Sequence, residues 1–241
     1  MSDFIANICK ELSGVADLQR PFLELRNVES GRAALVVGNS PWRVGFDLAA
    51  WGGPVIGCNA LYRDFEPDYL CVYDTNMIDE VLRSEFIGRT RKTRVIFRAT
   101  ETKSLVLSAM SPETRSGWYA ADGHMPLGGL CGPMAITVAG WLGCHSVTLV
   151  GFSFDEGNIY QGTPNYSPEG RWEEYQLEPG GRPESIGRVE EAIRQYKVFV
   201  PDGYVHVIAP ADWSLQRLEH LSMKVERGMS REDRFRARSR R

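Results

Sequence analysis

The apolar run at residues 33–37, followed by the turn tetrad Gly38-Asn39-Ser40-Pro41, limits the fold more than any other stretch of the chain. A run of this kind, without alternating polar positions, is typical of a strand buried on both faces of a parallel sheet. Ligands of open α/β sheets bind where such strands end, because the loops converge there. Gly38 can adopt a positive φ and let a ligand approach the backbone, and the Asn39 amide can both donate and accept hydrogen bonds. The tetrad is therefore a binding site or an ordinary turn, and it matches neither the dinucleotide fingerprint nor the P-loop.

The same pattern of a buried run followed by polar residues recurs along the chain. A second strand is predicted at residues 55–58 and is followed by Asn59. A third is predicted at residues 69–73 and is followed by Asp74 and Asn76. The carboxyl ends of neighbouring parallel strands lie at one edge, so we expect these side chains and the asparagine of the first strand to line one crevice. Each of them alone is also a common turn former or helix cap.

Later segments complete an α/β pattern. Further strands are predicted at 94–98 and 146–150, helices at 78–82 and 185–196, and closing strands or a hairpin at 198–200 and 205–208. Residues 100–127 are rich in Ser, Thr, Gly and Pro and predict a lid or a surface loop. The expected fold class is α/β, with a mostly parallel sheet flanked by helices and a loop-rich lid.

A glycine loop at 128–132 opens an apolar helix. The start of such a helix presents free backbone N–H groups and the positive end of a dipole, which favour an anion such as phosphate. The predicted strand at 146–150 ends in a polar stretch of its own. Candidate substrate contacts from these two segments are Gly129, Cys131, Gly132, Ser153 and Asp155.

Composition divides the chain into a helical segment at 1–30, a domain at 31–222 and a basic tail at 223–241. Residues 224–241 carry eight basic and three acidic residues, whereas the net charge of the whole chain is -3. The tail is either a solvated terminus or a segment that attracts an anionic partner such as nucleic acid, lipid or an acidic protein. The acidity of the remaining chain argues against a domain that wraps nucleic acid.

The five cysteines are scattered and include no C-x-x-C pair. This spacing predicts neither a disulfide framework nor a zinc site, and we expect no bound metal. The sequence has no apolar leader and no run of 18 apolar residues, so a reducing cytoplasm is the expected location.

In order and spacing, several short motifs between residues 33 and 215 resemble those of the bacterial sialyltransferases that act on lipooligosaccharide. The resemblance extends to motility-associated flagellin glycosylation factors and to 6-hydroxymethylpterin diphosphokinase-like proteins. It implies a Rossmann-like (GT-A variant) fold and a nucleotide-activated donor, CMP-sialic acid in the sialyltransferases, with no required cofactor. The motifs are Val-Val-Gly38-Asn39-Ser40-Pro41, Ile-Gly-Cys58-Asn59-Ala-Leu-Tyr62, Tyr73-Asp74, Gly128 to Gly132, and Leu-Val-Gly151-Phe152-Ser153-Phe154.

The resemblance also implies roles for individual residues. Asn39 and Asn59 match nucleotide-contacting asparagines, and Asp74 matches a further polar contact. The glycine loop matches the segment that holds the phosphate and carboxylate of the donor. Tyr160 and Tyr166 match tyrosines that assist departure of the phosphate. The family's general-base histidine has no counterpart, because the region before Val189 reads Gly180-Gly181-Arg182-Pro183-Glu184; Glu184 is the candidate base there.

Three functions remain open at this point. The first is a nucleotide-dependent transferase, most simply a glycosyltransferase that uses a CMP-sugar. The second is a pterin diphosphokinase, which would need ATP and Mg²⁺ held by carboxylates such as Asp74 and Asp155. The third is a non-catalytic descendant that serves as a structural or interaction protein, for instance in a virus, as the missing histidine and the basic tail suggest. The acceptor and any self-association are not specified by the sequence.

Overall fold

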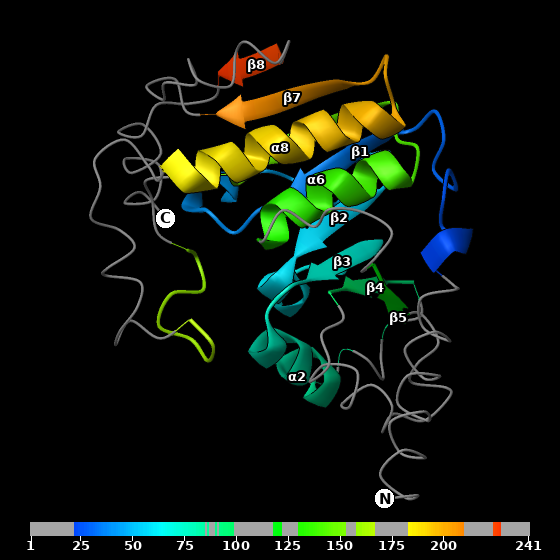
Figure 1. Ribbon diagram of the computed structural model, residues 1–241. Coiled ribbons are helices and arrows are strands. Elements are labelled where there is room, and N and C mark those ends of the chain that lie inside the picture. The colour runs from blue at the N-terminus through cyan, green and yellow to red at the C-terminus, as the bar shows by residue number, and fades with distance from the viewer. Residues whose placement is uncertain are drawn as a thin grey trace, which may run out of the picture.

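The computed structural model describes residues 22–84, 86, 90, 92–98, 118–121, 130–152, 158–166, 183–209 and 224–227. Within these residues, eight strands form one sheet in the order β5-β4-β3-β2-β1-β6-β7-β8, and every neighbouring pair is parallel (Figure 1). The predicted α/β class with a parallel sheet is thereby confirmed. The strands are β1 (Ala33–Val37), β2 (Val55–Cys58), β3 (Tyr69–Val72), β4 (Arg94–Phe97), β5 (Trp118–Ala120), β6 (Ser146–Val150), β7 (Tyr204–Ala209) and β8 (Lys224–Arg227).

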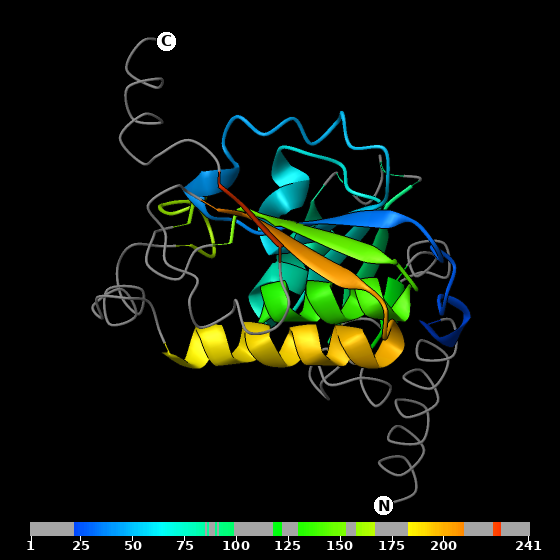
Figure 2. The same ribbon diagram turned by 90° about the horizontal axis from the view of Figure 1, so that it is seen from above.

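Helices α6 (Cys131–Trp141) and α8 (Pro183–Phe199) lie together on one face of the sheet, as Figure 2 shows. Helix α6 is buried along its whole length because it packs between the central strands and α8. The two helices approach closely at Gly140, where a Cβ atom would lie 3.0 Å from the Cα of Tyr196. The other described helices are α2 (Thr75–Arg83) and the 3-10 helices η1 (Pro41–Arg43) and η2 (Asn59–Arg63).

The central strands β1, β2 and β3 bury side chains on both faces, as their unbroken apolar sequences predict. Ala34 and Val36 of β1 belong to the core under α6 and α8. Leu35 and Val37 point to the opposite face and share a second core with Ile78 of α2. Each central strand thus contributes alternately to two cores, which fixes its register against its neighbours.

The sheet order changes direction at β1. This strand lies between β2 and β6, with Val37 opposite Gly57 on one side and Val150 on the other. From β1 the chain first builds the sheet toward β5 and then returns to add β6, β7 and β8 on the other side. The carboxyl ends of β1 and β6 therefore form the topological switch point at which α/β sheets bind ligands.

Two glycine turns pack against each other at this switch point. Gly38 does not use the positive φ that is open to glycine, whereas Gly151, after β6, has a φ of 71°. A Cβ atom on Gly38 would lie 2.3 Å from the carbonyl oxygen of Gly151. The Gly38 N–H donates to the Val150 carbonyl, and the Ser40 N–H donates to the Gly151 carbonyl, both at 2.9 Å. Gly38 is therefore required for contact between two loops of the protein itself, rather than for the approach of a ligand.

Three expectations differ from the structure. Strand β5 lies within the segment expected to be a lid or loop. The apolar residues at 198–199 end helix α8 and do not start a hairpin, because Phe199 packs edge-on against Trp141 at 5.6 Å between ring centroids. Residues 224–227, expected to begin the basic tail, form β8 alongside β7. Of the segment expected to be helical at 1–30, residues 22–24 are helical and residues 25–31 form turns, whereas residues 1–21 lie outside the described residues.

Candidate functional site

The ends of β2 and β3 bring two of the predicted site residues into direct contact. Asn59 is 9 % exposed, and its φ of 45° is in the left-handed region that asparagine tolerates better than most residues. Its Nδ2 donates to the Asp74 carboxylate at 3.1 Å, and its Oδ1 accepts from the Tyr73 N–H at 3.3 Å. Asp74 stands at the N-terminus of α2 without capping it through its side chain. The pair therefore holds the ends of two strands together and leaves carboxylate lone pairs available to a ligand.

Asn39 reaches across from the end of β1 to the same place. Its Nδ2 donates to the Cys58 carbonyl at 3.3 Å, one residue before Asn59. Its Oδ1 is buried and has no hydrogen-bond partner in the described part of the chain. The neighbouring Ser40 uses its hydroxyl to accept from the Trp42 N–H at 3.3 Å and so caps η1.

Helix α6 begins at this edge of the sheet. The Cys131 thiol donates to the Cys71 carbonyl at 2.8 Å, and burial raises its pKa well above the usual range, so it stays protonated. Helix geometry leaves the N–H groups of Cys131 and Gly132 without intrahelical partners, and the N-cap residue Leu130 makes no side-chain hydrogen bond to them. These donors and the helix dipole make the start of α6 favourable for an anion.

Two arginines hold the loop at 158–166 in place: Arg43 of η1 and Arg63 of η2. The guanidinium of Arg43, a residue only 7 % exposed, donates to Asp64 at 2.9 Å and to the Tyr160 hydroxyl at 2.5 Å. The same hydroxyl donates to Asp64 at 2.5 Å. Arg63 donates to Glu80 at 2.7 and 2.6 Å, and to Thr163 and the Pro164 carbonyl at 2.5 and 2.8 Å.

This loop places two tyrosines differently although their rings lie only 5.8 Å apart. The Tyr160 hydroxyl is engaged by Asp64 and Arg43. The Tyr166 hydroxyl is buried and makes no hydrogen bond of normal geometry to the described residues. Burial raises the pKa of both hydroxyls, and the amide of Asn59 opposes part of that rise at Tyr166. Tyr166 therefore keeps its proton, and its hydroxyl is near enough to Asn59 and Asp74 for both to influence its pKa.

Buried polar atoms without partners mark this edge of the sheet. Among the described side chains, the buried nitrogen and oxygen atoms that lack a partner are Asn39 Oδ1, Arg43 Nε and the Tyr166 hydroxyl. Such atoms are uncommon in native structures and each calls for an explanation. All three belong to segments joined at the strand ends: Asn39 bonds Cys58, Arg43 bonds Tyr160, and the carbonyl of Asn39 accepts from Ile159 at 2.9 Å. We take the edge where β1, β2 and β3 end, defined by Asn39, Asn59 and Asp74, as the candidate site and call it the crevice.

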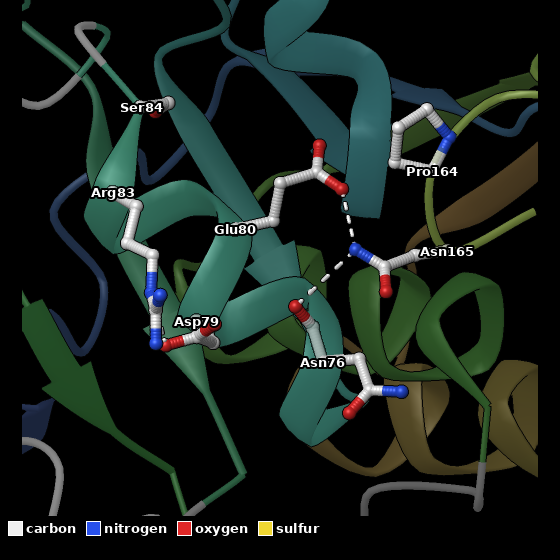
Figure 3. Close-up of a pocket in the computed structure, with 7 residues that line it drawn as sticks. All are labelled: Asn76, Asp79, Glu80, Arg83, Ser84, Pro164 and Asn165. Atoms are coloured by element: carbon white, nitrogen blue, oxygen red, sulfur yellow. Dashed lines mark hydrogen bonds and ion pairs between the residues drawn. The ribbon is translucent and has the colours of Figure 1, made fainter.

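The remaining predicted residues lie at the margin of this crevice or outside the described residues. Asn76 is on α2, beside a cavity that the loop at 158–166 closes on its other side (Figure 3). Glu184 lies in the first turn of α8, which starts at the edge where the strands end (Figure 1). Gly129, Ser153 and Asp155 are outside the described residues.

The sequence interpretation missed Arg43, Asp64, Arg63 and Glu80. Arg63 and Glu80 are 17 positions apart and Arg63 and Thr163 are 100 apart, so no local pattern connects them. The available signal was one arginine five or six positions after each of the first two predicted strands, Arg43 after residue 37 and Arg63 after residue 58.

Within the described ranges, no group of three His, Cys, Asp or Glu residues is placed to hold a metal ion. None of the described helices has both the length and the hydropathy needed to cross a bilayer.

No protein-family model matches the chain, and no curated protein matches it. Two solved structures are similar to it. One is the sialyltransferase CstII from Campylobacter jejuni in complex with the substrate analogue cytidine-5'-monophosphate (CMP). The sequence identity is 12 %, the match covers 81 % of this chain and 85 % of that chain, and the TM-score is 0.49. The other is a tyrosine-to-phenylalanine variant of the sialyltransferase Cst-II with CMP, at 13 % identity, 73 % and 80 % coverage and a TM-score of 0.45.

Proposed function

We propose that this protein is a nucleotide-dependent transferase that binds a CMP-sugar in the crevice where β1, β2 and β3 end. The observation that carries the proposal is the group of buried, unpartnered polar atoms at that edge: an amide oxygen on Asn39, a guanidinium N–H on Arg43 and a hydroxyl on Tyr166. An amide oxygen accepts from the amino or hydroxyl groups of a nucleoside, and the other two donate to a phosphate.

In this proposal the start of α6 and the Tyr166 hydroxyl act on the leaving phosphate. During transfer, the bond between the sugar carbon and the phosphate oxygen breaks, and the phosphate leaves with the electron pair. The oxygen of an acceptor hydroxyl bonds to that carbon and its proton passes to a base, for which Glu184 is the proposed residue. Preorganised donors directed at the developing negative charge are the largest contribution to catalysis in reactions of this kind. The raised pKa of Tyr166 keeps its proton available for donation.

No metal is required for this scheme, because the helix N-terminus and the hydroxyl supply the positive potential. The experiment is a calorimetric titration with CMP, CMP-sialic acid, UDP, GDP and ATP, each in EDTA and again in Mg²⁺. We expect binding of CMP and its sugar that does not depend on the metal. Binding of ATP only with Mg²⁺ would favour the diphosphokinase. Failure of every nucleotide to bind would favour the non-catalytic protein and turn attention to partners of the basic tail.

A variant pair tests the crevice itself. Asn39→Ala removes the unpartnered oxygen together with one hydrogen bond of 3.3 Å, and should weaken CMP binding about tenfold or more. Gln195→Ala is the control, because that amide is on the surface of α8 and bonds only its helical neighbour Glu191 in the described structure. Equal CMP affinity in the two variants would refute the crevice.

A further inference from the structure

A cavity of about 430 Å³ lies beside the crevice, between α2 and the loop at 158–166. Its walls are Asn76, Asp79, Glu80 and Arg83 on the helix, with Pro164 and Asn165 on the loop (Figure 3). The volume is within the range of small-molecule sites. Two of its residues are close in sequence to residues of the candidate site: Asn76 is two residues after Asp74, and Asn165 precedes Tyr166.

The back of the cavity is fixed by Glu80. This carboxylate accepts four hydrogen bonds: from the Tyr62 hydroxyl at 2.5 Å, from Arg63 at 2.7 and 2.6 Å, and from the Asn165 Nδ2 at 2.6 Å. Burial alone would raise the pKa of Glu80, but these hydrogen bonds and the charge of Arg63 lower it overall, so the group stays ionised. Because the lone pairs of Glu80 are all used, it orients the cavity wall and does not offer a ligand for a cation.

Asn165 is held in an orientation that suits binding. Its φ of 64° is in the left-handed region, which is uncommon for a residue other than glycine. Its Nδ2 donates to Glu80 and, at 3.4 Å, to the carbonyl of Asn76. Figure 3 shows its Oδ1 turned away from Glu80, on the side where the amide of Asn76 lies. The two amides therefore supply an acceptor and a donor next to each other.

The charges of the cavity cancel in pairs. Arg63 neutralises Glu80 from behind, and Arg83 pairs with Asp79 at 2.9 Å. No net charge remains to attract an anion or a cation, while amide, carboxylate and guanidinium groups remain to bond hydroxyls. This chemistry suits a neutral, hydroxyl-rich molecule.

We infer that the cavity is the subsite for the acceptor, a neutral sugar whose reactive hydroxyl is directed toward the crevice. The role of acceptor rests on the proposed transferase function, whereas the expected affinity for a neutral sugar follows from the chemistry of the cavity itself.

The test is a set of NMR titrations that follow the side-chain amide signals of Asn76, Asn165 and Asn39. Methyl glucoside, galactoside and mannoside are the neutral probes, and methyl glucuronide is the anionic counterpart; each is added with and without CMP. We expect at least one neutral glycoside to shift the Asn76 and Asn165 signals, and the glucuronide to bind more weakly. In Asn76→Ala, the affinity for the glycoside, measured from the Asn165 amide signal, should fall about tenfold. In the control variant Gln195→Ala, the affinity should not change.

The outcomes separate the two proposals. If CMP shifts Asn39 but none of the glycosides shifts the cavity signals, the subsite is overturned and the proposed function stands. Preference for the glucuronide, or equal affinity in Asn76→Ala and Gln195→Ala, also overturns it. If a glycoside shifts the cavity signals while CMP leaves Asn39 unchanged, the sugar site stands and the proposed donor fails.

Discussion

The two tyrosines of the loop at 158–166 allow one chemical change to be made in two environments. Tyr160→Phe removes a hydroxyl that donates to Asp64 and accepts from Arg43, both at 2.5 Å. Tyr166→Phe removes a hydroxyl that is equally buried but has no partner of normal geometry in the described structure. Both rings stay in place, including their packing at 5.8 Å and the contacts of Arg63 at 5.4 and 5.6 Å.

The expected magnitudes follow from these contacts. Hydrogen bonds to charged groups contribute about 1.5–3 kcal/mol each, and the 49 % exposure of the Asp64 side chain reduces the value of that bond. We expect Tyr160→Phe to lower the free energy of unfolding by about 2–3 kcal/mol, or the Tm by about 4–10 °C. Tyr166→Phe should leave the stability unchanged or raise it by up to about 1 kcal/mol, because burying an unpartnered hydroxyl is costly.

Ligand binding should show the opposite order. If the Tyr166 hydroxyl donates to the donor phosphate, Tyr166→Phe weakens CMP binding about tenfold, whereas Tyr160→Phe, measured well below its Tm, changes it little. Urea denaturation and calorimetric titration on the same samples give both quantities. A loss of stability in Tyr166→Phe equal to that in Tyr160→Phe would show that the hydroxyl is satisfied in the folded protein, and the argument from unpartnered atoms would fail.

Three other predictions concern the fold. Gly38→Ala should lower the free energy of unfolding by about 3 kcal/mol or more, because the added Cβ would lie 2.3 Å from a backbone oxygen. Gly52→Ala is the control and should leave the stability unchanged, because its Cβ would have nothing within 4 Å. Equal Tm values for the two variants would contradict the close packing of the two glycine turns. The pKa of Glu80 is lowered in the folded protein, so its contribution to stability is full above the unfolded value of about 4.3 and is lost as the pH falls through the lower folded value. Between pH 6 and pH 3 the Tm of Glu80→Gln should therefore fall less than that of the unmodified protein, and parallel curves would refute this. Truncation after Met223 should lower the Tm relative to truncation after Arg227, because only the former removes β8 from the edge of β7; identical melting would argue against that strand.

The part of the fold that could be predicted is the part encoded in short apolar runs. β1, β2 and β3 are unbroken apolar runs buried on both faces, and β4 and β6 add only Arg94, Ser146 and Thr148 to such runs, so these strands are recognisable without context. Strand β5 is three residues long within a Ser- and Gly-rich region, and β8 begins and ends with a basic residue, so neither has a recognisable apolar pattern. The end of α8 was misassigned because Val198 and Phe199 have β propensity that the contact with Trp141 overrides.

The site could be predicted in the same partial way. Parallel topology alone places Asn39, Asn59 and Asp74 at one edge, and the structure brings them together. The ion pairs that hold the loop at 158–166 could not be foreseen, because Arg43 meets Tyr160 across 117 positions and neither residue has an unusual neighbour in sequence. Interactions that depend on tertiary structure alone leave no periodic trace.

The position of β1 between β2 and β6 also has a consequence for synthesis on the ribosome. β2 follows closely in the chain, but β6 is made roughly 110 residues after β1, which takes about 5–20 s at the usual rates of translation. During that interval one hydrogen-bonding edge of the future central strand has no native neighbour, and the apolar residues Ala34 and Val36 lack the helix that later covers them. Strand pairings between such distant segments form slowly and expose nascent chains to aggregation. We therefore expect the yield of folded protein to depend on chaperones and on growth temperature more strongly than the stability of the finished domain would suggest.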